Sequence, residues 1–199
     1  MGTFTLVKMS IFKKKPLPYD LSNFTILVVE DSEYMQSLIA SMLKVFGVGD
    51  ILACANAKEA IDILTIMQAS RKSRYLGKVD IVLTDWLMPK GSGADLLRWI
   101  RESESDSVRF LPVIVISGYT TEYLTTVVRD MGAHEILVKP VSGTGLASRI
   151  CSVIDTPRPF INVDGFFGPD RRRHDMPYEG KERRLMTAEQ IKVKDGSGE

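Results

Sequence analysis

The sequence has few of the residues that would indicate a disulfide-bonded or thiolate-metal protein. Its two cysteines, Cys54 and Cys151, form no C-x-x-C pair and lie in apolar segments. This pattern predicts buried, reduced thiols rather than a disulfide framework or a zinc site, and the cytoplasm is the simplest location that keeps thiols reduced. The two histidines, His134 and His174, have no partner at ligand spacing, so we expect surface or turn positions for both.

Long hydrophobic runs and a dominant charge are also missing. No segment approaches the ~20 apolar residues of a membrane span. Residues 1–18 contain no apolar stretch long enough for the core of a signal peptide. Twenty-six basic residues against 25 acidic ones leave a net charge of +1. The chain therefore has no overall field that would attract nucleic acid, and the arginines at 171–173 are partly cancelled by acidic neighbours.

Short apolar runs alternate with amphipathic segments from about residue 24 onward. The apolar runs predict strands at residues 24–30, 50–53, 79–85, 111–117 and 135–138. Apolar residues at three- and four-residue spacing predict helices at residues 33–46, 57–69, 94–101, 122–131 and 145–154. Gly47 and Gly132 stand where helix C-caps belong, and Asn56 stands at an N-cap position. Repeated strand-then-helix units predict an α/β domain whose parallel sheet carries helices on both faces.

Three parts of the chain can be distinguished by composition. Residues 1–22 form an N-terminal extension, residues 23–156 a single domain, and residues 157–199 a tail rich in proline, glycine and charge. The tail is only near the ~40-residue limit below which a segment rarely folds unaided. Phe160, Phe166 and Phe167 lie close together in it, so we expect it to dock on its own domain or on a partner. The basic insertion at residues 70–78 predicts a surface loop.

Charged and hydroxyl side chains follow the predicted strands at the point where each strand ends. They are Glu30 and Asp31 after the first strand, Asp85 after the third, Ser117 after the fourth and Lys139 after the fifth. In a parallel α/β sheet, ligands bind beyond the carboxyl ends of the strands, so these groups are expected to share one edge. Adjacent carboxylates repel one another unless a hard cation binds them, and Mg²⁺ suits this role because it binds carboxylates and phosphate oxygens together. Asp85 is then the natural nucleophile toward a phosphoryl donor.

The order and spacing of these residues resemble the receiver domain of two-component response regulators. The resemblance covers about residues 24–154 and rests on Glu30-Asp31, Asp85 with Leu87-Met88-Pro89 and Gly93, Ser117-Gly118, and Lys139-Pro140. It implies a flavodoxin-like, doubly wound sheet of five parallel strands in the order 2-1-3-4-5, with five helices. It also implies a cis peptide bond between Lys139 and Pro140, since X-Pro bonds lower the cis penalty.

The same resemblance implies the role of each site residue. Asp85 accepts the phosphoryl group, and Ser117 and Lys139 bind the phosphoryl oxygens. Asp31, Asp85 and the backbone carbonyl of Leu87 ligate Mg²⁺, and Glu30 supports the metal through water. A histidine kinase or phosphotransfer protein donates the phosphoryl group, and the only chemistry is self-phosphorylation and self-dephosphorylation. Output is by binding an unknown protein partner, whereas the oligomeric state and a role as relay intermediate stay open.

Three alternatives were weighed against this interpretation. A haloacid-dehalogenase-type phosphohydrolase needs an aspartate two residues after the nucleophile, where this chain has Leu87. A dinucleotide-binding domain needs a glycine-rich turn after the first strand, where this chain has acidic residues. A pseudo-receiver, which keeps the fold but is not controlled by phosphorylation, is the main alternative. It is favoured by Ile136, at a position where the family commonly has an aromatic residue that reports phosphorylation.

Overall fold

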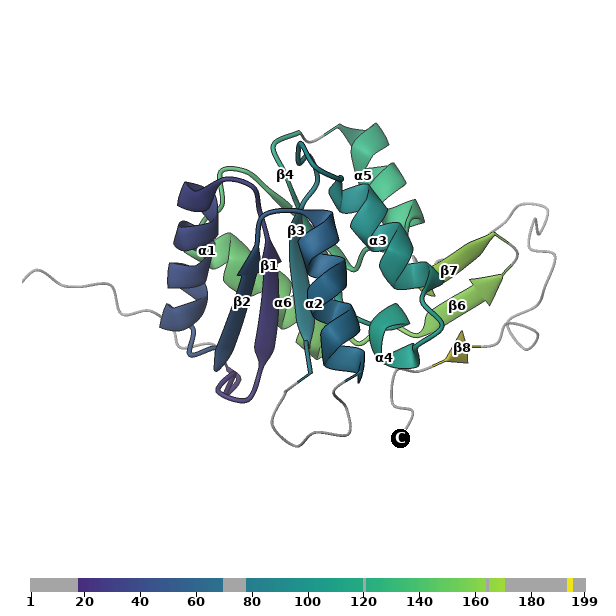
Figure 1. The fold of residues 1–199 in the computed structure, drawn as a ribbon, viewed down its shortest axis with the longest axis horizontal. Coiled ribbons are helices and arrows are strands. Elements are labelled where there is room, and N and C mark those ends of the chain that lie inside the picture. The colour runs from purple at the N-terminus through teal and green to yellow at the C-terminus, as the bar shows by residue number, and fades with distance from the viewer. Residues whose placement is uncertain (1–17, 70–77, 120, 164, 171–192, 195–199) are drawn as a thin grey trace, which may run out of the picture.

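The computed structural model describes residues 18–69, 78–119, 121–163, 165–170 and 193–194. In chain order its elements are β1 (Thr25–Val29), α1 (Glu33–Val45), β2 (Asp50–Cys54), α2 (Ala57–Ala69), β3 (Ile81–Asp85), α3 (Gly93–Glu102), α4 (Asp106–Arg109), β4 (Val113–Ser117), α5 (Glu122–Asp130), β5 (Glu135–Val138), α6 (Gly143–Asp155), β6 (Phe160–Val163), β7 (Phe166–Pro169) and β8 (Val193–Lys194). Strands β1 to β5 pair in parallel in the order β2-β1-β3-β4-β5, and helices cover both faces of this sheet (Figure 1). The predicted fold class is confirmed.

The sheet is sandwiched between two apolar layers because its central strands are apolar on both faces. Every residue of β1, β3 and β4 is buried. Alternate residues of a strand point to opposite faces, so Leu27 packs with α2, α3 and α5 while Ile26 packs with α1 and α6. Near-continuous Val, Ile and Leu runs are therefore what a strand buried on both faces requires.

The predicted elements lie within two residues of the observed ones at both ends. Gly47 and Gly132 adopt φ angles of 82° and 92° after α1 and α5, the left-handed conformation in which glycine ends a helix at low cost. Asn56 accepts a hydrogen bond from the backbone N–H of Glu59 at 3.0 Å, as an N-cap does. The Lys139-Pro140 peptide bond is cis, as expected.

Four short elements were missed by the sequence analysis. Helix α4 is a single turn, which is too short to show helical periodicity. Strands β6, β7 and β8 form a small antiparallel sheet in the order β7-β6-β8. An available signal for β6 and β7 was the Asp-Gly pair at positions 164 and 165, which is typical of a hairpin turn between two short apolar runs.

The hairpin of β6 and β7 packs against the end of the domain where α3 and α4 lie (Figure 1). Phe160 is 3% exposed, and its ring centroid lies 4.7 Å from that of Phe110 in an edge-on arrangement. Phe167 lies 5.3 Å from both rings, and the guanidinium of Arg109 is 3.8 Å above its ring. Phe166 is half-buried. We expected these phenylalanines to dock on their own domain or on a partner, and in the structure they pack on their own domain.

The expectation for His134 was wrong, because this side chain is buried at 8% exposure. It begins the segment leading into β5, and Phe160 of the hairpin covers it, with 5.5 Å between ring centroids. Sequence neighbours alone could not reveal this contact, since it depends on the unforeseen hairpin. Cys54 is buried as expected, and burial raises the pKa of its thiol to about 11, whereas Cys151 is half-buried.

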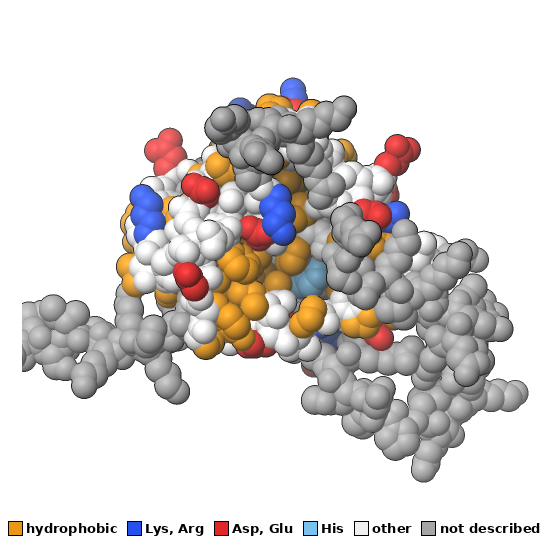
Figure 2. Space-filling view, turned by 90° about the horizontal axis from the view of Figure 1, so that it is seen from below, with side chains coloured by type: hydrophobic (Ala, Val, Ile, Leu, Met, Phe, Trp, Pro, Cys, Tyr) orange, Lys and Arg blue, Asp and Glu red, His pale blue; other side chains and the backbone are white. Residues whose placement is uncertain are grey.

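Several predictions fall outside the described residues, namely those on residues 1–17, on the insertion at 70–77, on the arginines at 171–173 and on His174. Within the described part of the chain, no helix is long and apolar enough to cross a membrane. Figure 2 shows the molecule from the amino-terminal edge of the parallel strands. On the described part of that face, acidic and basic side chains are interspersed around a central apolar area, so no single charge dominates it.

Candidate functional site

The candidate site lies where the strand order reverses, between β1 and β3. The connections that follow these two neighbouring strands run to opposite sides of the sheet, so the carboxyl ends of the strands border a crevice. Glu30 and Asp31 follow β1 directly, and Asp85 is the last residue of β3. The topology therefore brings residues more than fifty positions apart to the same edge.

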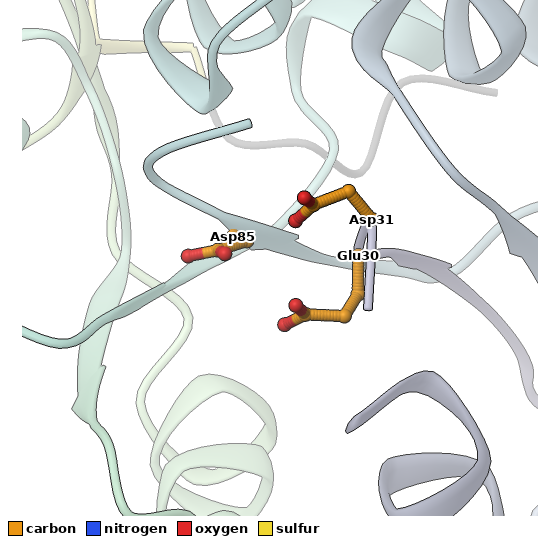
Figure 3. A group of neighbouring side chains, drawn as sticks. All are labelled: Glu30, Asp31 and Asp85. Carbon is orange, nitrogen blue, oxygen red and sulfur yellow. The ribbon is translucent and has the colours of Figure 1, made fainter. Parts of the chain in front are cut away.

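Three carboxylates converge at this edge (Figure 3). One carboxylate oxygen each from Glu30, Asp31 and Asp85 lies within 4.8 Å of the others. Glu30 and Asp85 are 2% and 6% exposed, whereas Asp31 is exposed. Like charges at this spacing repel strongly when water is partly excluded, so the group requires a compensating cation.

Lys139 supplies part of that compensation. Its Nζ donates to Asp85 Oδ2 at 2.8 Å and to Glu30 Oε1 at 3.3 Å, and it lies 2.9 Å from Glu30 Oε2. Burial raises the pKa of Glu30, and the charge of Asp85 adds to this rise, whereas Lys139 opposes it without cancelling it. Burial by itself lowers the pKa of Lys139, but its hydrogen bonds to Asp85 and Glu30 outweigh burial and raise it overall. One ammonium therefore remains firmly charged without neutralising the whole pocket.

Ser117 ends β4 beside this pocket, but its hydroxyl is engaged elsewhere. Ser117 Oγ accepts a hydrogen bond from the backbone N–H of Tyr119 and donates one to the Tyr119 carbonyl, both at 3.1 Å. This is a local turn bond of the kind that serine hydroxyls often make. Leu87, two residues after Asp85, has an exposed side chain, and the ligand role of its backbone carbonyl stays a prediction.

Local structure explains how the acidic residues are held. Ser32 caps α1 by accepting from the N–H of Met35, and its own N–H donates to Glu30 Oε1 at 3.4 Å. Helix α3 begins beside Asp85, where a side chain at position 93 would collide with the Asp85 carbonyl. Only glycine fits there, which explains why Gly93 belongs to the motif.

Two residues that support the site were missed by the sequence analysis. Gln36 in α1 donates from its side-chain amide to the backbone carbonyls of Glu30, at 3.3 Å, and Cys54, at 3.0 Å. It thereby joins the ends of β1 and β2 next to the acidic pair. Thr84 is fully buried, and its hydroxyl donates to the Asp85 carbonyl at 3.0 Å. Gln36 completes the first turn of α1, close to the strand ends, and this placement was the one available signal.

The donor set fits Mg²⁺. This ion prefers oxygen ligands, takes one or two carboxylates and keeps several waters. Glu30 Oε2 is buried and forms no aligned hydrogen bond with a described residue, although Lys139 lies close to it, so it can accept from a metal-bound water. Asp31 and Asp85 are the residues that would hold the ion, which would neutralise carboxylate charge and bind phosphate oxygens.

Comparison with known proteins agrees with this geometry. Residues 26–151 match the family described as response regulator receiver domain. This chain belongs to the receiver domain family. It is 29% identical over 133 residues to chemotaxis protein CheY-3 of Vibrio cholerae, which covers 67% of this chain and 93% of that protein. It is 27% identical over 129 residues to the transcriptional regulatory protein CpxR of Escherichia coli, covering 65% of this chain and 48% of that protein.

Solved structures show the same relationship. The crystal structure of a CheX–CheY–BeF₃–Mg²⁺ complex from Borrelia burgdorferi matches with a TM-score of 0.57 at 27% identity, covering 66% of this chain and 89% of that one. A receiver domain from a Clostridium thermocellum response regulator matches with a TM-score of 0.54 at 28% identity, covering 66% and 94%. A receiver domain is a signalling module rather than a catalytic enzyme. Membership of this family also implies that a histidine kinase is a partner of the chain.

Proposed function

We propose that this receiver is a phosphorylation-activated switch in which Asp85 accepts a phosphoryl group from the phosphohistidine of a kinase or phosphotransfer protein. The observation that carries the proposal is the hydrogen bond from Lys139 Nζ to Asp85 Oδ2 at 2.8 Å. That bond fixes one carboxylate oxygen, and Asp85 Oδ1 forms no hydrogen bond with another described residue. The free oxygen is thus available to attack phosphorus while the phosphorus–nitrogen bond breaks.

The remaining site residues have matching roles in this proposal. Lys139 stays charged and stabilises negative charge on the transferring group. Asp31 and Asp85, with the Leu87 carbonyl, would hold Mg²⁺, and Glu30 would support it through water; the ion would supply positive charge to the phosphate oxygens. Ser117 exchanges its bonds to Tyr119 for a bond to a phosphoryl oxygen. This exchange alters the loop after β4 and gives the domain a second conformation that a downstream protein can recognise.

The test compares phosphorylation of wild type, Asp85→Asn and Asp62→Asn by a small-molecule phosphodonor with Mg²⁺. Asp62 is an exposed aspartate of α2 far from the motif, so its variant is a matched control. Intact-mass spectrometry should show a hydroxylamine-sensitive phosphoryl adduct on wild type and on Asp62→Asn, and none on Asp85→Asn. Equal adduct formation on Asp85→Asn would move the acceptor to another residue.

The second candidate function is a pseudo-receiver, which binds a partner without phosphorylation. The observation that favours it is Ile136, an aliphatic residue packed against the core where an aromatic reporter is common. The same experiment distinguishes the two functions. Mg²⁺ binding without any adduct, under conditions that label another receiver, would favour the pseudo-receiver.

A further inference from the structure

The chain that leaves α6 is fastened to the domain at two points. We call residues 158–163 and 165–170 the strap. Its first anchor is the ion pair between Arg158 NH2 and Glu135 Oε1, which lie 3.2 Å apart. Glu135 is buried at the start of β5 and also binds Ser152 and Arg149 of α6. Arg158 is the nearer of the two arginines on this buried carboxylate, at 3.2 Å against 3.6 Å for Arg149, so this anchor holds the strap close to the sheet.

The second anchor is the packing of the strap over Arg101. The guanidinium of Arg101 lies 5.2 Å from the ring centroid of Phe160. Arg101 Nε donates to the carbonyl of Gly132 at 2.9 Å, and NH1 donates to the carbonyl of Arg109 at 2.7 Å. These bonds connect the last turn of α3 with the ends of α4 and α5, and Phe160 covers them from outside.

Arg101 makes this junction sensitive to the strap. The side chain is buried, and among the described residues it forms no ion pair. Burial lowers the pKa of Arg101 to about 9, so the guanidinium is still charged at neutral pH. This buried cation depends on two carbonyls, on His134 Nδ1 at 3.4 Å from its NH2, and on the Phe160 ring, and it gains hydration when that ring is withdrawn. The covered and uncovered arrangements therefore differ in the hydration of a buried charge.

Helix α5 connects this junction to the acidic pocket. It begins just after the loop whose Tyr119 is bonded to Ser117, and it ends at Asp130, two residues before Gly132. Of its nine residues, all described, only Val128 is buried, so few contacts along its length hold it. In the turn that follows this helix, the strap lies against the backbone of Gly132, because a Cβ on Gly168 would lie 2.9 Å from the Gly132 Cα. A displacement at one end of this helix is thus transmitted to the other.

We propose that the strap is a built-in restraint on α5 that opposes filling of the acidic pocket. When docked, it holds α5 in the arrangement in which the Ser117 hydroxyl is bonded to Tyr119. The inference rests on the proposed function, since filling the pocket draws that hydroxyl toward a phosphoryl oxygen. Linkage is reciprocal, so undocking the strap tightens ligand binding by the same factor by which the ligand favours undocking.

The sharpest variant is Gly168→Ala, because the added methyl group lies 2.9 Å from both the Gly132 Cα and the Phe166 ring. The ring end of Phe166 can turn aside, whereas the backbone of Gly132 cannot, so the strap is pushed away from the turn after α5. Gly165→Asn is the matched control on the same hairpin. Gly165 has φ 79°, which asparagine tolerates, and nothing lies within 4 Å of an added Cβ. Arg158→Gln is a second undocking variant, which removes the ion pair with Glu135 and changes no residue of the hairpin itself.

Each variant is made in a Trp99→Phe background, and Mg²⁺ with beryllofluoride is titrated while Trp86 emission is recorded. We expect Gly168→Ala and Arg158→Gln to bind about fivefold or more tightly than wild type, and Gly165→Asn to bind like wild type. In wild type, the backbone amides of the strap should exchange hydrogen faster once the ligand is bound.

The outcomes separate this inference from the proposed function. Normal beryllofluoride binding with equal affinities and unchanged strap exchange would overturn the restraint and leave the switch intact. Weaker binding in both undocking variants would also overturn it, since the strap would then assist the filled state. Failure of beryllofluoride to bind wild type would overturn the switch and the restraint together.

Discussion

The buried histidine makes stability depend on pH in a way that can be calculated. Burial lowers the pKa of His134 well below 6.5, and the positive charges of Arg101 and Arg158 lower it further. The folded protein therefore keeps His134 neutral, while the unfolded chain takes up a proton as the pH falls through 6.5. A depressed pKa of this kind contributes stability above pH 6.5 that is lost progressively below it. Between pH 7.5 and 5.5 the free energy of unfolding should fall by about 1.4 kcal/mol. Only the one pH unit below 6.5 contributes, at ~1.4 kcal/mol for the one proton that the unfolded chain takes up.

The assay is urea unfolding of wild type and His134→Asn at pH 7.5 and 5.5. The Nδ1 atom of His134 accepts a hydrogen bond from the N–H of Val113 at 3.3 Å, and asparagine places a carbonyl oxygen near that position. The variant is expected to be less stable at both pH values because the ring contact with Phe160 is lost. Its loss between the two pH values should nevertheless be smaller than that of wild type by ~1.4 kcal/mol. Equal losses in the two proteins would refute the reasoning, because other titrating groups are common to both.

Two further predictions concern the two ends of the sheet. Glu30→Gln should raise the free energy of unfolding without Mg²⁺ at pH 7, because the raised pKa of Glu30 means that its ionised form is unfavourable in the fold. This gain in stability should vanish below pH 4.5, where Glu30 is protonated in both the folded and the unfolded wild type. The variant should also bind Mg²⁺ more weakly. A variant that is less stable than wild type at pH 7 would contradict the prediction. Phe160→Ala should cost about 3–5 kcal/mol in urea unfolding, whereas the control Tyr123→Ala, at an 80% exposed position, should change stability by less than ~0.5 kcal/mol. Similar effects of the two substitutions would mean that the strap does not pack as described.

The acidic pocket could be predicted because topology alone determines it. Once the apolar runs are assigned to parallel strands, the residues that end them must meet at one edge, whatever the details of packing. Four of the predicted residues meet at that edge, and each lies at the end of its strand or within two residues of it: Glu30, Asp31, Asp85 and Lys139. Ser117 taken alone predicts a local turn hydroxyl, and its bonds to Tyr119 are of that kind, whereas the motif predicts that the same hydroxyl binds a phosphoryl oxygen.

The amino-terminal end of the sheet could not be predicted in the same way. From the sequence alone, Arg101 is one more basic residue in the last turn of an amphipathic helix, and such residues are usually exposed to solvent. Its burial depends on carbonyls contributed by two other turns and on a ring from the strap. The carbonyl of Gly132 is 31 positions away and Phe160 lies further still, so no local pattern encodes these two contacts.

The two ends of the sheet place opposite demands on protonation. At the carboxyl end, Glu30 favours a proton, so ionisation of the pocket above pH 4.5 reduces stability unless a cation is bound. At the amino end, His134 excludes a proton, so acidification below pH 6.5 reduces stability. Near neutral pH His134 imposes no cost, whereas ionised Glu30 does. A cation that occupies the pocket removes the cost of ionising Glu30, so its binding at Glu30, Asp31 and Asp85 contributes more to the stability of the fold at neutral pH than below pH 4.5, where Glu30 is protonated.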